Sequence, residues 1–392
     1  MSLKNIPNKS SRNLSLDLFR GITVFWMVVV NNPGSWTHIF PLLKHSDWNG
    51  LLSADLVFPF FLIAVGASIP LAYRKRISLG ETNKEIFSHV LIRTFFLFGV
   101  GFLMNGFPNW DWENWRIPGV LQRIAIVYLF GYISFIRIPK IFRLIFFPIF
   151  LIFYTWLIVF SAPPDWIPFN QSSLDVAFSY TAQFNWSAYL DRLILGDHLW
   201  RVSKFWDPEG ILSTIPAIMS AWLGIFLTER KSYSQSDLKS KDINFYFLAI
   251  SSTLLMLIGY LGNFIFPINK GIWSSSFVLV TGGYAYLLII LLSLWKVYSW
   301  NNWLVQLFQI LGKSALFVFI FTGMLSRILT IPAYGISPKI WITSQLQFFL
   351  DPRMNSLLYT LVYLSYTISI TLLWYYGKIW ITSYIRLMYT KR

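Results

Sequence analysis

Residues 15–34 read SLDLFRGITVFWMVVVNNPG, an apolar stretch with charged residues near its start and two asparagines near its end. Its length suits one membrane crossing, because a helix needs about 20 mostly apolar residues to span hydrocarbon. Inside a bilayer the backbone polar groups must be paired within the segment, so such a stretch folds as a helix. It therefore predicts an integral membrane protein.

The rest of the chain repeats this pattern. Its 392 residues are 55% hydrophobic and only 12% charged, which lies outside the usual range of soluble proteins. We predict an all-α integral membrane protein, with 1–392 forming a single transmembrane domain. About ten transmembrane helices are expected, near residues 17–34, 52–72, 89–106, 118–136, 141–161, 210–228, 244–264, 273–295, 302–325 and 355–376.

The net charge of +15 permits two interpretations: the protein binds nucleic acid, or its Lys and Arg residues set its orientation in the membrane. Most Lys and Arg residues fall in alternate connections, as in Arg74, Lys75 and Arg76, and cytoplasmic loops carry such an excess. We therefore expect both termini to be cytoplasmic and no nucleic-acid partner. The connection 162–209 then becomes one long external loop, which we expect to fold over the outer mouth. No small-residue cleavage site follows the first helix, so we expect it to be retained.

The chain has no cysteine, which excludes a thiol nucleophile. It also lacks a Gly-rich phosphate loop and a GxSxG elbow, so the ATPase and serine hydrolase classes have no local support. His38, His45 and His198 are scattered rather than spaced like metal ligands, and we expect no metal.

The densest group of reactive side chains lies in residues 44–55, KHSDWNGLLSAD. Imidazole can take a proton from an amine or hold an acyl group, and Asp55 could orient His45. Asp55 enters an apolar helix, where an unpaired charge is expensive. The alternative reading is an exposed loop histidine bonded to its neighbours.

The first helix places Arg20 and Asn31 eleven residues apart, on one face and about 16 Å from each other. A ligand spanning much of the membrane could touch both. The alternative is a local Asp17–Arg20 ion pair, with Asn31 ending the helix before Pro33. Tryptophans near the external ends fit an interfacial belt, or flat platforms on which a sugar ring stacks.

These residues resemble the catalytic membrane domain of heparan-alpha-glucosaminide N-acetyltransferase and its bacterial relatives, a family of multi-pass acyltransferases. The resemblance runs nearly end to end and rests on six blocks in order: SLDLFRG at 15–21, VNNPG at 30–34, KHSDWNGLLSADLVFPFFL at 44–62, PGVLQRIA at 118–125, DPEGILSTIPAI at 207–218 and PINKGIWSSSFVL at 267–279.

The resemblance implies an acetyl-CoA-dependent N-acetyltransferase of the bacterial inner membrane, which passes acetyl from cytoplasmic acetyl-CoA to an external amino sugar or glycan. His45 matches the family's catalytic histidine, with Asp55 and Asn31 as expected catalytic partners. Arg20, Arg93 and Lys313 are expected to meet the phosphates of CoA. The acceptor site is expected to contain Asn32, Trp48, Asn49 and Lys270. A homodimer is one candidate assembly.

A multi-pass solute or glycan transporter without acyl transfer is the alternative function. It predicts broken helices near the middle of the membrane and no need for acetyl-CoA. Convergence of His45, Asn31 and Asp55 at the outer end of the bundle would favour the enzyme.

Overall fold

The computed structural model describes residues 14–165, 182–229, 240–298, 302–333 and 335–390, and the external loop expected at 162–209 is therefore described in part. Helices dominate these residues, and their only β pairing is an isolated bridge between Ala333 and Ile336. The helices are α1 (Leu14–Asn31), η1 (Pro41–Leu43), η2 (Ser53–Leu56), α2 (Val57–Ser78), α3 (Asn83–Gly106), α4 (Val120–Arg137), α5 (Lys140–Phe160), α6 (Trp186–Leu195), α7 (Thr214–Glu229), α8 (Ser240–Gly262), α9 (Ser275–Tyr298), α10 (Trp303–Lys313), α11 (Ala315–Thr330), α12 (Pro338–Gln345) and α13 (Pro352–Thr390).

Every one of the ten predicted crossings corresponds to helix. Within the described residues eight helices are long and apolar enough to span a membrane, and the bent pair α10–α11 brings the number to nine. The segment expected at 210–228 forms α7, which is apolar but only 16 residues long. The protein is therefore a multi-pass helical membrane protein.

Helix α7 nevertheless packs along α2. The two helices cross so closely that a Cβ on Gly66 would lie 1.9 Å from the carbonyl oxygen of Ala221. A Cβ on Gly224 would lie 2.0 Å from the carbonyl oxygen of Ile63. Small residues allow this approach of helix backbones in membranes. At its last turn, α7 accepts a hydrogen bond from Arg74 at the end of α2.

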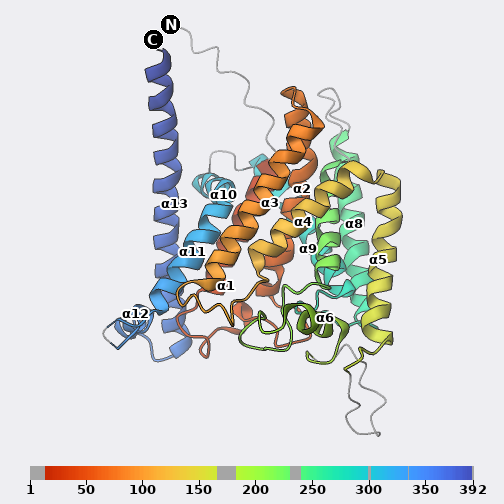
Figure 1. Ribbon diagram of the computed structural model, residues 1–392. Helices are drawn as coiled ribbons and strands as arrows, with labels where there is room; N and C mark the ends of the chain where they lie inside the picture. The colour runs from red at the N-terminus through yellow and green to blue at the C-terminus, as the bar shows by residue number, and fades with distance from the viewer. Residues whose placement is uncertain (1–13, 166–181, 230–239, 299–301, 334, 391–392) are drawn as a thin grey trace.

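Contacts between distant segments define two ends of the bundle (Figure 1). The His45 end, at the bottom of the figure, holds the last turn of α1, the loop before α2, α6 and the first turn of α7. The opposite end holds the α2–α3 turn and the last turn of α7, where Glu229 pairs with Arg143 of α5.

The last helix returns the chain to the opposite end. The hydroxyl of Thr360 donates to the carbonyl of Asn32 at 3.3 Å, so α13 begins where α1 ends. Helix α13 then rises beside α10 and α11, and its last turn lies at the same end as the first turn of α1 (Figure 1). The helical passes thus begin and finish at one end of the bundle.

The segment expected as one span at 302–325 is broken. Helices α10 and α11 meet at an angle of 76° around Ser314. A Cβ on Gly312 would lie 2.1 Å from the carbonyl oxygen of Asp17, and one on Gly21 would lie 1.8 Å from that of Phe308. Helix α10 therefore packs tightly on α1, and the chain must turn before α11 can cross the bundle.

Candidate active site

A histidine and a carboxylate meet at the His45 end. Nδ1 of His45 lies 2.8 Å from Oδ1 of Asp55, although ten residues separate them. The pair forms because His45 follows η1 and Asp55 lies in η2, and the chain between them folds back on itself. The Asp55 side chain is fully buried, whereas the His45 side chain is 35% exposed. The buried carboxylate of Asp55 therefore holds the partly exposed imidazole of His45 in place.

The second oxygen of Asp55 is also held. Oδ2 accepts hydrogen bonds from the backbone N–H groups of Ser46 and Leu52, both at 3.1 Å. An imidazole whose Nδ1–H donates to a carboxylate keeps its lone pair on Nε2. No described residue bonds to Nε2 of His45, so this nitrogen can accept a proton or attack a carbonyl carbon.

A lysine from the α8–α9 connection completes the cluster. Nζ of Lys270 lies 3.2 Å from Nδ1 of His45 and 3.5 Å from Oδ1 of Asp55, and its side chain is 26% exposed. Burial lowers the pKa of Lys270, while the carboxylates of Asp55 and Glu209 oppose this by raising it. The lysine was expected to bind the acceptor, and the structure places it against the histidine–carboxylate pair.

Two backbone and side-chain contacts fix the loops that carry these residues. Asn269 donates through Nδ2 to Oδ1 of Asn49 at 3.0 Å, and the N–H of Gly50 donates to the carbonyl of Ile268 at 2.7 Å. Gly50 has a φ of +119°, which side-chain-bearing residues rarely adopt. The side chain of Asn49 thus ties the His45 loop to the Lys270 loop.

Three tryptophans lie beside the cluster. Trp48 and Trp206 meet edge to face with ring centres 5.0 Å apart, and Trp200 lies 5.8 Å from Trp206. Both Trp48 and Trp206 close over Gly271, next to Lys270. The buried Nε1 of Trp48 has no hydrogen-bond partner among the described residues. These half-buried rings form an aromatic wall rather than a set of isolated interfacial residues.

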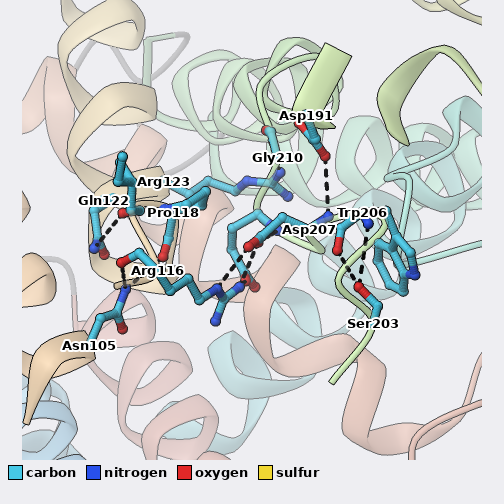
Figure 2. Close-up of polar contacts among 12 residues, drawn as sticks. Asn105, Arg116, Pro118, Gln122, Arg123, Asp191, Ser203, Trp206, Asp207 and Gly210 are labelled. Carbon is cyan, nitrogen blue, oxygen red and sulfur yellow. Dashed lines mark hydrogen bonds and ion pairs between the residues drawn. The ribbon is translucent and has the colours of Figure 1, made fainter. Parts of the chain in front are cut away.

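An ion-pair network anchors the connecting segments at the His45 end (Figure 2). Arg116 donates to both carboxylate oxygens of Asp207, at 2.8 and 2.6 Å, and also to Glu209. Burial lowers the pKa of Arg116, but these two carboxylates outweigh burial and raise it. The α3–α4 loop is therefore fastened to the segment that enters α7, and Glu209 also acts on Lys270.

A second carboxylate supports the same segment. Asp191 of α6 accepts from the N–H group of Asp207 at 3.2 Å (Figure 2). It also accepts from the N–H group of Ile211 at 2.8 Å. Burial raises its pKa to about 7, although both hydrogen bonds lower it. The buried Arg123 donates to the carbonyl of Gly210 at 3.0 Å and lies over the Trp273 ring. The described part of the connection 162–209 is thus packed onto the bundle.

The two asparagines at the end of α1 behave differently. Asn32 is buried and donates to the carbonyl of Val28 at 2.9 Å, as a residue that ends a helix does. Asn31 is exposed at the same end as His45, and its side chain has no hydrogen bond to His45 or Asp55 among the described residues. Two of the three expected catalytic side chains are therefore in contact.

The three expected phosphate-binding cations have different partners. Arg20 donates to Ser68 at 2.7 Å and pairs with Asp17 at 3.2 Å. The Arg93 guanidinium lies 5.0 Å from the centre of the Tyr128 ring. Lys313, at the end of α10, lies over the ring of Tyr375 in α13. Arg20 thus forms the ion pair with Asp17 that was the alternative interpretation of the sequence. It also links α1 to α2 through its hydrogen bond to Ser68.

The other two histidines that were predicted to be external have separate partners. His38 contacts Thr37 at 3.0 Å, and Nδ1 of His198 contacts the carbonyl oxygen of Trp115 at 2.9 Å. Within the described ranges no group of three His, Cys, Asp or Glu side chains is placed to hold a metal ion.

Sequence reasoning missed the roles of Arg116, Asp207 and Glu209. Two of them lie in the block DPEGILSTIPAI, where two carboxylates precede an apolar helix by only a few residues. Such charges need a partner near a membrane. This signal could have indicated an ion pair, but it could not have identified Arg116, which is 91 residues from Asp207.

Comparison with known proteins agrees with the resemblance seen in the motifs. A family model described as a domain of unknown function, DUF5009, matches residues 12–137. Human heparan-alpha-glucosaminide N-acetyltransferase is 29% identical over 331 residues, which cover 71% of this chain and 48% of that protein. The mouse protein of the same name is 29% identical over 328 residues, with 73% and 49% covered. The chain spans about half the length of these curated relatives.

Proposed function

We propose that this chain is a membrane acyltransferase that moves acetyl from acetyl-CoA, at the opposite end of the bundle, to an amino sugar or glycan at the His45 end. The observation that carries the proposal is the contact of His45 with buried Asp55 and with Lys270. It is supported by similarity to proteins named as N-acetyltransferases, which covers about 70% of this chain. The excess of Lys and Arg in the connections at the opposite end supports an orientation in which the His45 end lies outside the cytoplasm, and the membrane we propose is a bacterial inner membrane.

The chemistry follows from the free Nε2. In direct transfer, Nε2 of His45 accepts a proton from the acceptor amine as its nitrogen attacks the thioester carbonyl. A C–N bond forms, the C–S bond breaks, and the proton passes from His45 to the departing thiolate. Asp55 stabilises the imidazolium that exists between these steps. In a two-step route the same Nε2 attacks the thioester first, the C–S bond breaks and the CoA thiolate leaves. The acceptor amine then attacks the acetyl-imidazole, the bond from acetyl to Nε2 breaks, and the freed Nε2 takes the amine proton.

The donor and the acceptor approach from different ends. We propose that Arg20, about 16 Å from Asn31 along α1, contacts the donor's phosphates through charge-assisted hydrogen bonds. Exposed Asn31 and Asn49 supply amide groups for a sugar's hydroxyls, and the Trp48 wall supplies an apolar face for its ring. Glucosamine-type sugars combine such a ring with the amine that the reaction needs.

Acetyl transfer by the purified full chain tests the proposal. Labelled acetyl-CoA is incubated with glucosamine and with glucosaminides, and labelled N-acetyl product is measured. We expect product with the native chain and none above background with His45→Ala. The matched control is His38→Ala, which removes another external histidine and should retain native turnover. Native turnover in His45→Ala would contradict the proposed role of His45.

One observation favours a second candidate, a solute or glycan transporter. The 76° break between α10 and α11 resembles the discontinuous helices from which transporters build their binding sites. A transporter needs no acetyl-CoA. Uptake of a sugar by proteoliposomes that neither bind acetyl-CoA nor form N-acetyl product would favour this function over the enzyme.

A further inference from the structure

The opposite end of the bundle contains a cavity that the proposed reaction does not use. It has a volume of about 380 Å³ and lies between α2, α3 and α4. Its polar lining consists of Tyr73, Arg76, His89, Arg93, Tyr128 and Tyr132. Arg76 is in the last turn of α2, whereas the His45 loop precedes the first turn of that helix, so nearly the whole of α2 separates the two sites.

The charges of this cavity are not balanced. Glu81 binds Nη1 of Arg76 through both oxygens, at 3.0 and 2.7 Å, and lies 3.7 Å from Nε2 of His89. The carboxylate of Glu81 therefore lies within ion-pair distance of both Arg76 and His89. Arg93 has only the face of the Tyr128 ring, and no described carboxylate lies within ion-pair distance of it. A net positive charge remains at Arg93.

The wall of the cavity that carries Arg93 faces outward. Helix α3 is one of the candidate spans, yet only 28% of its apolar window is buried. Beside Arg93, the side chains of Ile92 and Phe96 are 63% and 54% exposed. Hydrocarbon covers such side chains in a membrane, and a cation among them needs an anionic partner or a path to the interface. The cavity thus combines a cation with an apolar, lipid-facing rim.

We propose that this cavity binds the phosphate head group of an anionic phospholipid from the adjoining leaflet. The Arg93 guanidinium has the fork of donors that matches phosphate oxygens, and Tyr128 adds a hydroxyl beside it. The acyl chains then lie along the exposed Ile92 and Phe96. Basic pockets between membrane helices commonly bind anionic head groups in this way. A soluble ligand with a phosphate but no acyl chain would not cover the apolar side chains at the rim of the cavity.

Native mass spectrometry of the purified full chain tests this site. Phosphatidylglycerol or phosphatidylcholine is added, and bound lipid is counted for the native chain, Arg93→Gln and Arg137→Gln. Arg137 is an exposed arginine at the same end of α4 and does not line the cavity. We expect phosphatidylglycerol to bind about tenfold more weakly to Arg93→Gln, because one charged hydrogen-bond partner is lost. Arg137→Gln should bind like the native chain, and equal binding by all three would overturn the proposal.

Two further measurements keep the test decisive. Hydrogen exchange of the native chain, in nanodiscs with or without phosphatidylglycerol, should show protection of residues 86–93 only when that lipid is present. Unchanged exchange would overturn the proposal without relying on a variant. Acetyl-CoA and inorganic phosphate are added as competitors. Displacement of phosphatidylglycerol by acetyl-CoA, but not by inorganic phosphate, would instead assign the cavity to the donor.

Discussion

At the scale of single residues, Asp55 is the best-supported side chain of the site. It accepts hydrogen bonds from the His45 imidazole and from two backbone N–H groups. A carboxamide in its place would direct its own NH₂ at one of these donors. If it turned the NH₂ toward His45, the imidazole would carry its proton on Nε2 and could no longer accept one there.

Asp55→Asn is therefore expected to lower kcat about a hundredfold or more, with little change in the KM of acetyl-CoA. Steady-state kinetics of the purified variant measures both constants. Asp47→Asn is the matched control, because Asp47 lies on the same loop, is 88% exposed and pairs with Lys44 rather than with His45. Native kcat in Asp55→Asn would remove the carboxylate from the mechanism.

Lys270 gives the site a pH dependence. Burial lowers its pKa, so Lys270 loses its proton at a pH below that at which a free lysine does. Above that point Asp55 loses the cation that lies 3.5 Å from it, and activity should fall. Arginine stays charged throughout, so Lys270→Arg should move the alkaline limb of the pH–rate profile to higher pH.

Lys270→Met should lower kcat about tenfold at neutral pH, equivalent to about 1.4 kcal/mol of lost transition-state stabilisation. Lys44→Met, which removes an exposed lysine near His45, is expected to leave the profile unchanged. If both variants retained the native alkaline limb, Lys270 would not govern the charge of the site.

The sequence indicated these residues unequally. Asp55 was identifiable because a charge so close to an apolar helix needs a partner. Lys270 could be assigned to the site only by resemblance, and its contact with His45 spans 225 positions of sequence. That contact depends on how the loops before α2 and α9 pair through Asn49 and Asn269, which local patterns do not encode.

At the scale of elements, the α2–α7 crossing positions the site, because α2 follows Asp55 directly and α7 follows Glu209. Gly66→Ala should destabilise this crossing by about 1–3 kcal/mol, since the added methyl meets the backbone of Ala221. A thermal-unfolding series in detergent measures the effect. Gly99→Ala is the control, because a Cβ at Gly99 meets nothing within 4 Å. Equal unfolding temperatures for the two variants would contradict the close crossing.

Hydrophobic runs were sufficient to predict most elements but not their lengths or breaks. The run 302–325 is apolar throughout, so it reads as one span, yet Gly312 packs against the α1 backbone and the chain bends at Ser314. The bend therefore depends on contacts with α1. Likewise α7 is short because ion pairs and hydrogen bonds, rather than helical turns, hold the residues from Asp207 to Ile211.

At the scale of the whole molecule, the fold separates two kinds of chemistry by the depth of a membrane. The His45 end has a partly open imidazole, a buried carboxylate and an aromatic wall. The opposite end has Arg20, the cation that we propose contacts the donor's phosphates. Basic connections near that end agree with a cytoplasmic orientation. This arrangement suits a reaction whose donor and acceptor never share a compartment.

Acetyl transfer across a sealed bilayer tests this account most directly. The purified full chain is reconstituted into liposomes, the orientation of each population is established by protease access to the His45 loop, and labelled acetyl-CoA and glucosamine are supplied on chosen sides. We predict N-acetyl product when acetyl-CoA faces the Arg20 end and glucosamine faces the His45 end, and none when the two are exchanged. Equal product in both arrangements, or product only when both substrates share one side, would contradict transfer through the bundle.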